Sequence, residues 1–197
     1  MYAMNIRETK QFVYHTSVRK KRPVMIWGMP GLGKSKGIEQ LVAELNATTE
    51  HGAILVDIRL SQYDSVDLRG VPTVDTGTTV WNVPATMPFK SNPKFNTFKG
   101  IIILFFDEIN AAAKATEAVA YQIVNDRHCG EHELMDNVVI VAAGNREGDK
   151  GVTNRMALPL CNRFTHVEAT VSHEAFQEYL LETNHPAECV AFFGFRK

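Results

Sequence analysis

The sequence predicts a three-layer α/β fold in which helices cover both faces of a parallel β-sheet. Four apolar runs of strand length alternate with helical patterns, as in βαβ units. Because these runs are continuous rather than alternating, each strand is expected to be buried on both faces. The runs are residues 24–27, 53–58, 101–106 and 138–143, and residues 164–169 form a weaker fifth.

Three helices are expected between or after these strands. Residues 34–46 place Ile38, Leu41, Val42 and Leu45 on one face, residues 111–127 are rich in alanine, and residues 172–183 open with a serine cap. Two insertions interrupt the alternation. Residues 61–93 contain a predicted hairpin over 71–83 that turns at 75–77, and residues 130–137 are expected to form a short hairpin or loop.

Length and composition predict one globular domain. The chain has 197 residues, of which 45% are hydrophobic and 22% charged, with a formal net charge of -1. This size allows a substantial core. The charge balance gives no global basic surface for nucleic acid. The only dense basic run, residues 19–22, is interpreted as a solvated helix end, with a phosphate or partner contact as the alternative.

Cysteine usage and hydropathy predict a cytoplasmic protein without membrane association. Cys129, Cys161 and Cys189 are far apart and odd in number, which indicates free thiols in a reducing compartment. No apolar run is long enough for a membrane span or a signal peptide. His128, Cys129 and His132 invite a zinc reading but lack the second ligand pair of a closed site, so turn residues are favoured.

The run that follows the first strand has the form G-x-x-x-x-G-K-S. Glycine-loop and helix N-terminal N–H groups point at phosphates, and the helix dipole favours their charge. Lys34 is expected to reach the β and γ phosphates, and the Ser35 hydroxyl to bind Mg²⁺. An ordinary glycine-rich turn is the alternative, which the preceding strand disfavours. The predicted cofactor-binding residues are Gly28, Met29, Pro30, Gly31, Leu32, Gly33, Lys34 and Ser35.

The third apolar run ends in an acidic pair. Asp107 and Glu108 follow it directly, and ligands of α/β sheets bind at the carboxyl ends of the strands. Asp107 is expected to hold Mg²⁺, and Glu108 to orient the attacking water. Such a pair can also cap a helix, but the glycine loop in the same chain favours the catalytic reading.

Three further residues are candidate catalytic groups. Asn145 follows the fourth strand, where its amide can hydrogen-bond a γ phosphate or the water, although Gly-Asn is also a common turn. Arg155 and Arg163 precede the fifth strand, and an arginine can stabilise charge on a transferred phosphoryl group. Their spacing does not show which subunit's phosphate either arginine reaches.

These motifs resemble the AAA+ ATPases, in particular the MoxR-like branch. The resemblance rests on residues 28–35, 104–110, 142–147 and 155–164, and extends to 67–72 and 121–122. It implies a P-loop core with a five-stranded sheet and ATP and Mg²⁺ as cofactors. It also implies a homo-oligomer that forms a hexameric ring if a C-terminal helical lid domain is supplied. By position Arg163 resembles an arginine finger, which acts on the nucleotide of a neighbouring subunit, and Arg155 resembles a second intersubunit contact. Related hairpins face the ring pore or a partner.

The expected organisation is one AAA+ nucleotide-binding core domain over residues 1–197. Residues 1–22 form an N-terminal helix and basic lead-in, residues 61–93 the hairpin insertion, and residues 184–197 the start of a truncated helical lid. The expected function is ATP-driven, chaperone-like remodelling of a protein partner, with a von Willebrand A domain protein as the partner class that the resemblance suggests. The alternatives are a nucleotide-gated binding module with little turnover and a DNA-associated motor. Neither hairpin is basic, which disfavours nucleic acid.

Overall fold

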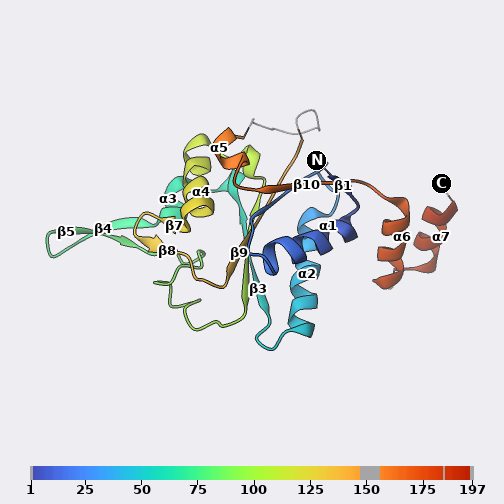
Figure 1. The fold of residues 1–197 in the computed structure, drawn as a ribbon, viewed down its shortest axis with the longest axis horizontal. Coiled ribbons are helices and arrows are strands. Elements are labelled where there is room, and N and C mark those ends of the chain that lie inside the picture. Colours follow the sequence, from blue (N-terminus) through green and yellow to red (C-terminus); the bar gives the residue numbers. More distant parts are fainter. Residues whose placement is uncertain (1, 147–155, 184, 196–197) are drawn as a thin grey trace.

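A six-stranded parallel sheet forms the centre of the computed structural model, which describes residues 2–146, 156–183 and 185–195 (Figure 1). The strand order is β1-β10-β2-β9-β6-β3, and every neighbouring pair is parallel. All five predicted strands are confirmed. The bounds are β1 (Tyr2–Met4), β2 (Val24–Trp27), β3 (Ala53–Arg59), β6 (Ile101–Asp107), β9 (Val138–Gly144) and β10 (Thr165–Ala169).

The prediction of five strands was wrong by one edge strand. β1 pairs with β10, so that Tyr2 lies opposite Val167 and Met4 opposite Ala169. The residues before the first predicted strand were expected to form a helix and a lead-in. The expected helix is present as α1 (Ile6–Val13), which continues as a π-helical turn over Tyr14–Val18, but the strand β1 precedes it. A three-residue strand carries too little apolar pattern to be distinguished from a helix start.

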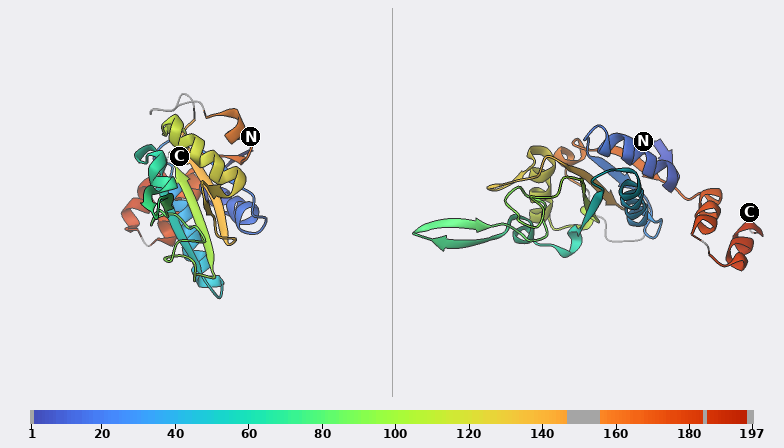
Figure 2. Two further views of the ribbon diagram at one scale, coloured as in Figure 1. Left: turned by 90° about the vertical axis from the view of Figure 1, so that its left-hand side faces the viewer. Right: turned by 90° about the horizontal axis from the view of Figure 1, so that it is seen from below.

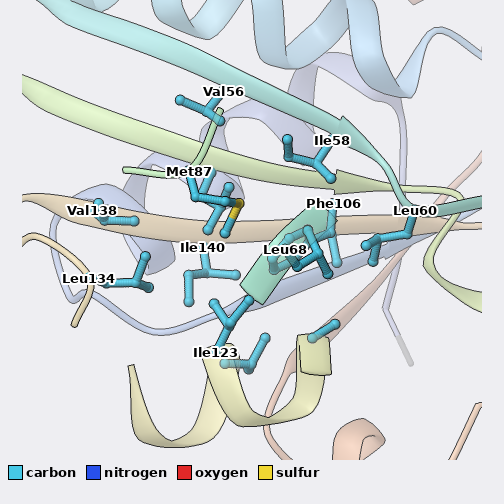
Figure 3. Packing of buried hydrophobic residues seen from close by; sticks show 14 of the residues in the cluster. Val56, Ile58, Leu60, Leu68, Met87, Phe106, Ile123, Leu134, Val138 and Ile140 are labelled. Atoms are coloured by element: carbon cyan, nitrogen blue, oxygen red, sulfur yellow. The ribbon is translucent and has the colours of Figure 1, made fainter. Parts of the chain in front are cut away.

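Helices cover both faces of the sheet, as predicted. α1 and α2 (Lys34–Thr48) pack on one face, while α3 (Ser65–Arg69), α4 (Lys114–Asp126) and α5 (Leu158–Cys161) pack on the other. Alternate residues of the central strands enter the two resulting cores. In β6, for example, Leu104 and Phe106 pack with Ile123 of α4, while Phe105 joins Leu41 on the α2 side. Figure 3 shows the first of these cores.

The predicted helix bounds shift at their ends. α2 extends two residues beyond the expected end, and α4 begins at Lys114 because a 3-10 turn, η3 (Ile109–Ala111), and an extended Ala113 precede it. α6 (His173–Glu182) begins after its predicted cap, since the Ser172 hydroxyl accepts a hydrogen bond from the backbone N–H of Ala175. α7 (Ala187–Phe195) follows α6, and the pair lies at one end of the molecule (Figures 1 and 2).

Both predicted hairpins are present. β4 (Val71–Asp75) and β5 (Thr78–Asn82) turn at the expected residues and project far from the body (Figure 2). The second hairpin, β7 (His128–Cys129) with β8 (His132–Glu133), begins two residues earlier than expected and is shorter. Within the described residues, no helix is long and apolar enough to cross a membrane.

Candidate functional site

Three adjacent strands bring the predicted site residues to one edge of the sheet. β2 leads into residues 28–35, its neighbour β9 ends before Asn145, and β6 beyond β9 ends at Asp107. Since all three strands are parallel, their carboxyl ends coincide. The topology therefore places the glycine loop, the acidic pair and the amide together, as expected from the sequence.

The glycine loop has the backbone that its glycines permit. Gly31 has φ +78° and Gly33 φ +91°, both in the left-handed region, and no atom lies within 4 Å of a Cβ built on either. The loop surface at these two positions is therefore open. Gly28 packs closely against β10, since a Cβ there would lie 2.8 Å from the Ala169 carbonyl oxygen. A glycine at this position lets the start of the loop lie against the sheet.

Lys34 lies inside the glycine loop. It is 8% exposed, and its Nζ donates hydrogen bonds to the Gly28 oxygen at 2.7 Å, the Met29 oxygen at 3.0 Å and Asn145 Oδ1 at 3.2 Å. A buried ammonium group needs such acceptors. The contact with Asn145 links the glycine loop to the end of β9.

Ser35 and Asp107 form the second link across the site. Ser35 Oγ donates a 2.8 Å hydrogen bond to Asp107 Oδ2, and the other carboxylate oxygen accepts a 2.9 Å bond from the Glu108 backbone N–H. Asp107 is only 7% exposed. A hydroxyl and a carboxylate at this distance form the oxygen donor set that Mg²⁺ prefers, so the residues present fit that ion.

Glu108 has a left-handed backbone with φ +53°, which is uncommon outside glycine. Its Oε2 accepts a hydrogen bond from the hydroxyl of Ser61, in the 3-10 turn η2 (Leu60–Gln62) that follows β3. Ser61 had no predicted role because it lies in the insertion, and only the pairing of β3 with β6 reveals its position. Strain of this kind at a carboxylate is typical of functional sites.

Asn145 is held through its backbone by a second asparagine. Asn110 Nδ2 donates to the Asn145 oxygen at 2.7 Å, and Asn110 Oδ1 accepts from the Asn145 N–H at 3.3 Å. Gly144 allows this approach, since a Cβ there would lie 2.6 Å from Asn110 Oδ1. Asn110 lies in a sequence motif but had no predicted role. Its contacts link β9 to the turn after the acidic pair.

A cleft of about 560 Å³ adjoins the glycine loop. It lies between that loop, α1 and α2 on one side and α6 and α7 on the other, and aromatic side chains line its far wall. Its size is within the range of small-molecule sites. Lining residues include Ile6, Met29, Gln40, Phe176, Tyr179 and Phe193.

The two arginine predictions have different outcomes. Arg155 lies outside the described residues. Arg163 is exposed after α5, and within the described chain its side chain makes no hydrogen bond or ion pair. The register pairs Thr165 with Val24, four residues before Gly28. At about 3.3 Å per residue, Arg163 lies toward the opposite end of the sheet from its own glycine loop.

The pKa values of two other titratable groups are shifted. Burial raises the pKa of Asp57 on β3, and the charge of nearby Asp107 raises it further. Burial also raises the pKa of the Cys129 thiol to about 11, although the charge of Arg69 opposes the shift. No group of three or more histidine, cysteine or acidic residues in the described ranges could hold a metal ion, so Cys129 and the neighbouring histidines form no such site.

Comparison with solved structures identifies the fold. A proposed ATPase from Cytophaga hutchinsonii matches with a TM-score of 0.57 over 91% of this chain and 51% of its own, at 14% identity. A mutant of RuvB from Thermotoga maritima matches with a TM-score of 0.51 over 88% of this chain and 47% of its own, at 16% identity. The chain thus spans about half the length of these proteins.

These similarities show the fold, a parallel sheet with helices on both faces, which this chain shares with the two proteins. No protein-family model matches the sequence, and no curated protein matches it. Because the two solved structures are only 14% and 16% identical to this chain, their similarity concerns the fold alone.

Proposed function

We propose that this protein binds and hydrolyses ATP with Mg²⁺ as an AAA+ ATPase. The observation that carries the proposal is the convergence of Lys34, Ser35, Asp107 and Asn145 through hydrogen bonds of 2.8 and 3.2 Å beside an open glycine loop. A lysine, an oxygen pair and an amide at one sheet edge match the needs of phosphoryl transfer, which are positioning and charge stabilisation.

Each side chain has one role in this proposal. Lys34 binds the β and γ phosphates, and the loop N–H groups of residues 28–35 cradle the phosphates. Ser35 and Asp107 hold Mg²⁺, which neutralises phosphate charge when bound. Glu108 orients the water, and Asn145 hydrogen-bonds the water or the γ phosphate. The adjacent aromatic cleft accommodates the adenosine.

Two variants test the proposal by separating binding from turnover. Lys34→Ala is expected to lose ATP affinity, because it removes the charge inside the glycine loop. Glu108→Gln is expected to retain ATP affinity and to lose phosphate release, because it removes only the water-orienting carboxylate. Equilibrium titration with a fluorescent ATP analogue, together with a phosphate-release assay, measures both. Equal loss of binding in the two variants would contradict the assigned roles.

The finer proposal is a MoxR-like, chaperone-like remodeller that acts on a protein partner as a cytoplasmic homo-oligomeric ring. The exposed β4–β5 hairpin supports a protein partner, because it presents Val71, Val74 and Val80 to solvent and contains no lysine or arginine. Nucleic acid would require a basic contact surface. A von Willebrand A domain protein is the partner class that the resemblance suggests.

Arg163 is proposed to act on the nucleotide of a neighbouring copy. Its exposure and its distance from its own glycine loop support this role. An arginine supplied in trans can stabilise the transition-state charge strongly. Arg155 is proposed as a second intersubunit contact. Arg163→Ala is expected to bind ATP normally and to fail in hydrolysis, and full activity of this variant would refute the assignment.

A further inference from the structure

A buried carboxylate holds the segment that leads to Arg163. Glu117, in the first turn of α4, is 4% exposed, and its Oε1 accepts a 2.6 Å hydrogen bond from the Ala157 backbone N–H. Ala157 is the residue before α5, whose end is followed by Arg163. Glu117 Oε2 forms a 2.6 Å ion pair with Lys114. Burial of a carboxylate is costly without such partners.

A histidine holds the other end of α5. His166 Nε2 contacts the oxygen of Cys161, the last residue of α5, at 2.7 Å. Its Nδ1 accepts a 2.8 Å hydrogen bond from Trp27 Nε1, so Nε2 carries the proton donated to Cys161. Trp27 directly precedes the glycine loop. One helical turn is therefore fixed at both ends by side chains of other elements, Glu117 of α4 and His166 of β10.

We propose that Glu117 and His166 are positioning residues that fix the orientation of α5 and thereby present Arg163 to a neighbouring copy of the chain. This inference rests on the proposed function, because it assigns the device that aims the arginine acting in trans. A single turn attached at one point can pivot, whereas two attachments determine its direction. Neither side chain contacts the predicted phosphate site.

The contacts of α4 explain why Glu117 is suited to this role. The neighbouring Thr116 donates a 3.0 Å hydrogen bond to the Tyr63 oxygen, two residues after the Ser61 that holds Glu108. The first turn of α4 is thus attached both to the segment beside the catalytic carboxylate and to the segment that carries Arg163. Thr116 holds the first of these segments and Glu117 holds the second, so loss of the Glu117 carboxylate releases the segment that carries Arg163 and leaves the contact near Glu108 in place.

The hydrogen bond itself is tested by amide exchange. In Glu117→Ala the Ala157 N–H loses its acceptor, so peptides spanning residues 156–163 are expected to exchange faster than in the wild type. Glu117→Gln keeps an amide oxygen as acceptor and is expected to retain protection. Glu44→Ala is the matched control, because Glu44 is exposed on α2 and its carboxylate pairs with Lys10 at a distant surface. Unchanged exchange in Glu117→Ala overturns the inference.

The positioning role is tested by mixing variants. The Glu108→Gln protein is the donor, because it supplies Arg163 but cannot hydrolyse ATP. The Arg163→Ala protein is the acceptor, because it retains Glu108 but lacks the arginine. A mixture of the two is expected to regain ATP turnover. Adding Glu117→Ala to the Glu108→Gln donor is expected to lower the regained turnover at least about tenfold, since small misplacements of a catalytic group cost this much. Adding Glu117→Ala to the Arg163→Ala acceptor is expected to change nothing. His166→Leu is expected to repeat this asymmetry.

The outcomes separate the inference from the proposed function. Equal loss on the donor and acceptor sides identifies a merely structural role and overturns the inference. A parental mixture that regains no turnover also overturns it, while ATP hydrolysis by the wild type leaves the proposed function standing. Absence of hydrolysis by the wild type refutes the proposed function itself. Rescue of the donor by Glu117→Gln supports the hydrogen bond as the cause.

Discussion

The Ser35 hydroxyl donates a 2.8 Å hydrogen bond to the Asp107 carboxylate, although 72 positions separate the two residues in the chain. This contact joins the start of α2 to the end of β6 across the intervening edge of β9. Its importance is chemical, because it places two oxygen donors where a cation could bind beside the glycine loop.

Removal of the Asp107 charge is expected to lower the affinity of the site for Mg²⁺. Asp107→Asn should raise the Mg²⁺ concentration for half-maximal phosphate release by roughly tenfold or more, in line with losses seen when metal-site groups are altered. Asp75→Asn, at the tip of the β4–β5 hairpin, is the control and should not change this concentration. An unaltered Mg²⁺ requirement in Asp107→Asn would argue against a metal at this position.

Asn110 is expected to contribute to both stability and turnover. Asn110 is 4% exposed, and Asn110→Ala removes its two hydrogen bonds to the Asn145 backbone. The free energy of unfolding should fall by about 1–3 kcal/mol, and kcat should fall more than ATP affinity because Asn145 loses its support. Urea denaturation and steady-state kinetics measure these effects. The exposed Asn125→Ala should change neither quantity, and wild-type kcat in Asn110→Ala would contradict the proposed support.

Much of this arrangement could be predicted from the sequence, because strong local patterns carry it. The continuous apolar runs identify the buried strands, and the parallel topology then brings their carboxyl ends together without further information. The glycine loop, Asp107 and Asn145 each directly follow such a run. Their convergence is therefore a consequence of strand order, in which β9 lies between β2 and β6.

The missed features depend on contacts between distant segments. β1 gains its partner from a strand more than 160 residues away, and its three residues have no period of their own. Ser61, Glu117 and His166 are polar residues in ordinary surroundings until the fold brings them into contact with Glu108, Ala157 and Cys161, respectively. No local spacing distinguishes them from solvated residues, so only the tertiary structure identifies them.

The β4–β5 hairpin is expected to contribute little to stability. All of its strand residues except Trp81 are exposed, and a two-stranded hairpin is marginal by itself. Replacement of residues 72–81 by a short Gly-Ser turn should change the free energy of unfolding by less than about 1 kcal/mol and leave basal ATP hydrolysis unchanged. Thermal and urea denaturation measure the first effect. A much larger loss would mean that the hairpin packs on the body.

The cysteines are expected to differ in reactivity. Burial raises the pKa of Cys129 to about 11, so its thiol remains protonated at pH 8, whereas Cys189 is exposed. Because the thiolate is the nucleophile, iodoacetamide at pH 8 should label Cys189 and spare Cys129 until urea unfolds the chain. Stability should then fall as the pH rises from 9 toward 11, since the folded state disfavours the thiolate. Mass spectrometry of native samples checks the labelling, and rapid modification of Cys129 would contradict its burial.

The most direct test of the central claim is a crystal structure of the Glu108→Gln variant with ATP and Mg²⁺. We expect the triphosphate on residues 28–35, the Lys34 ammonium against the β and γ phosphates, and the cation beside Ser35 and Asp107 with Asn145 at the γ phosphate. A nucleotide bound elsewhere, or a triphosphate that Lys34 and Asp107 do not share, would contradict the proposed site.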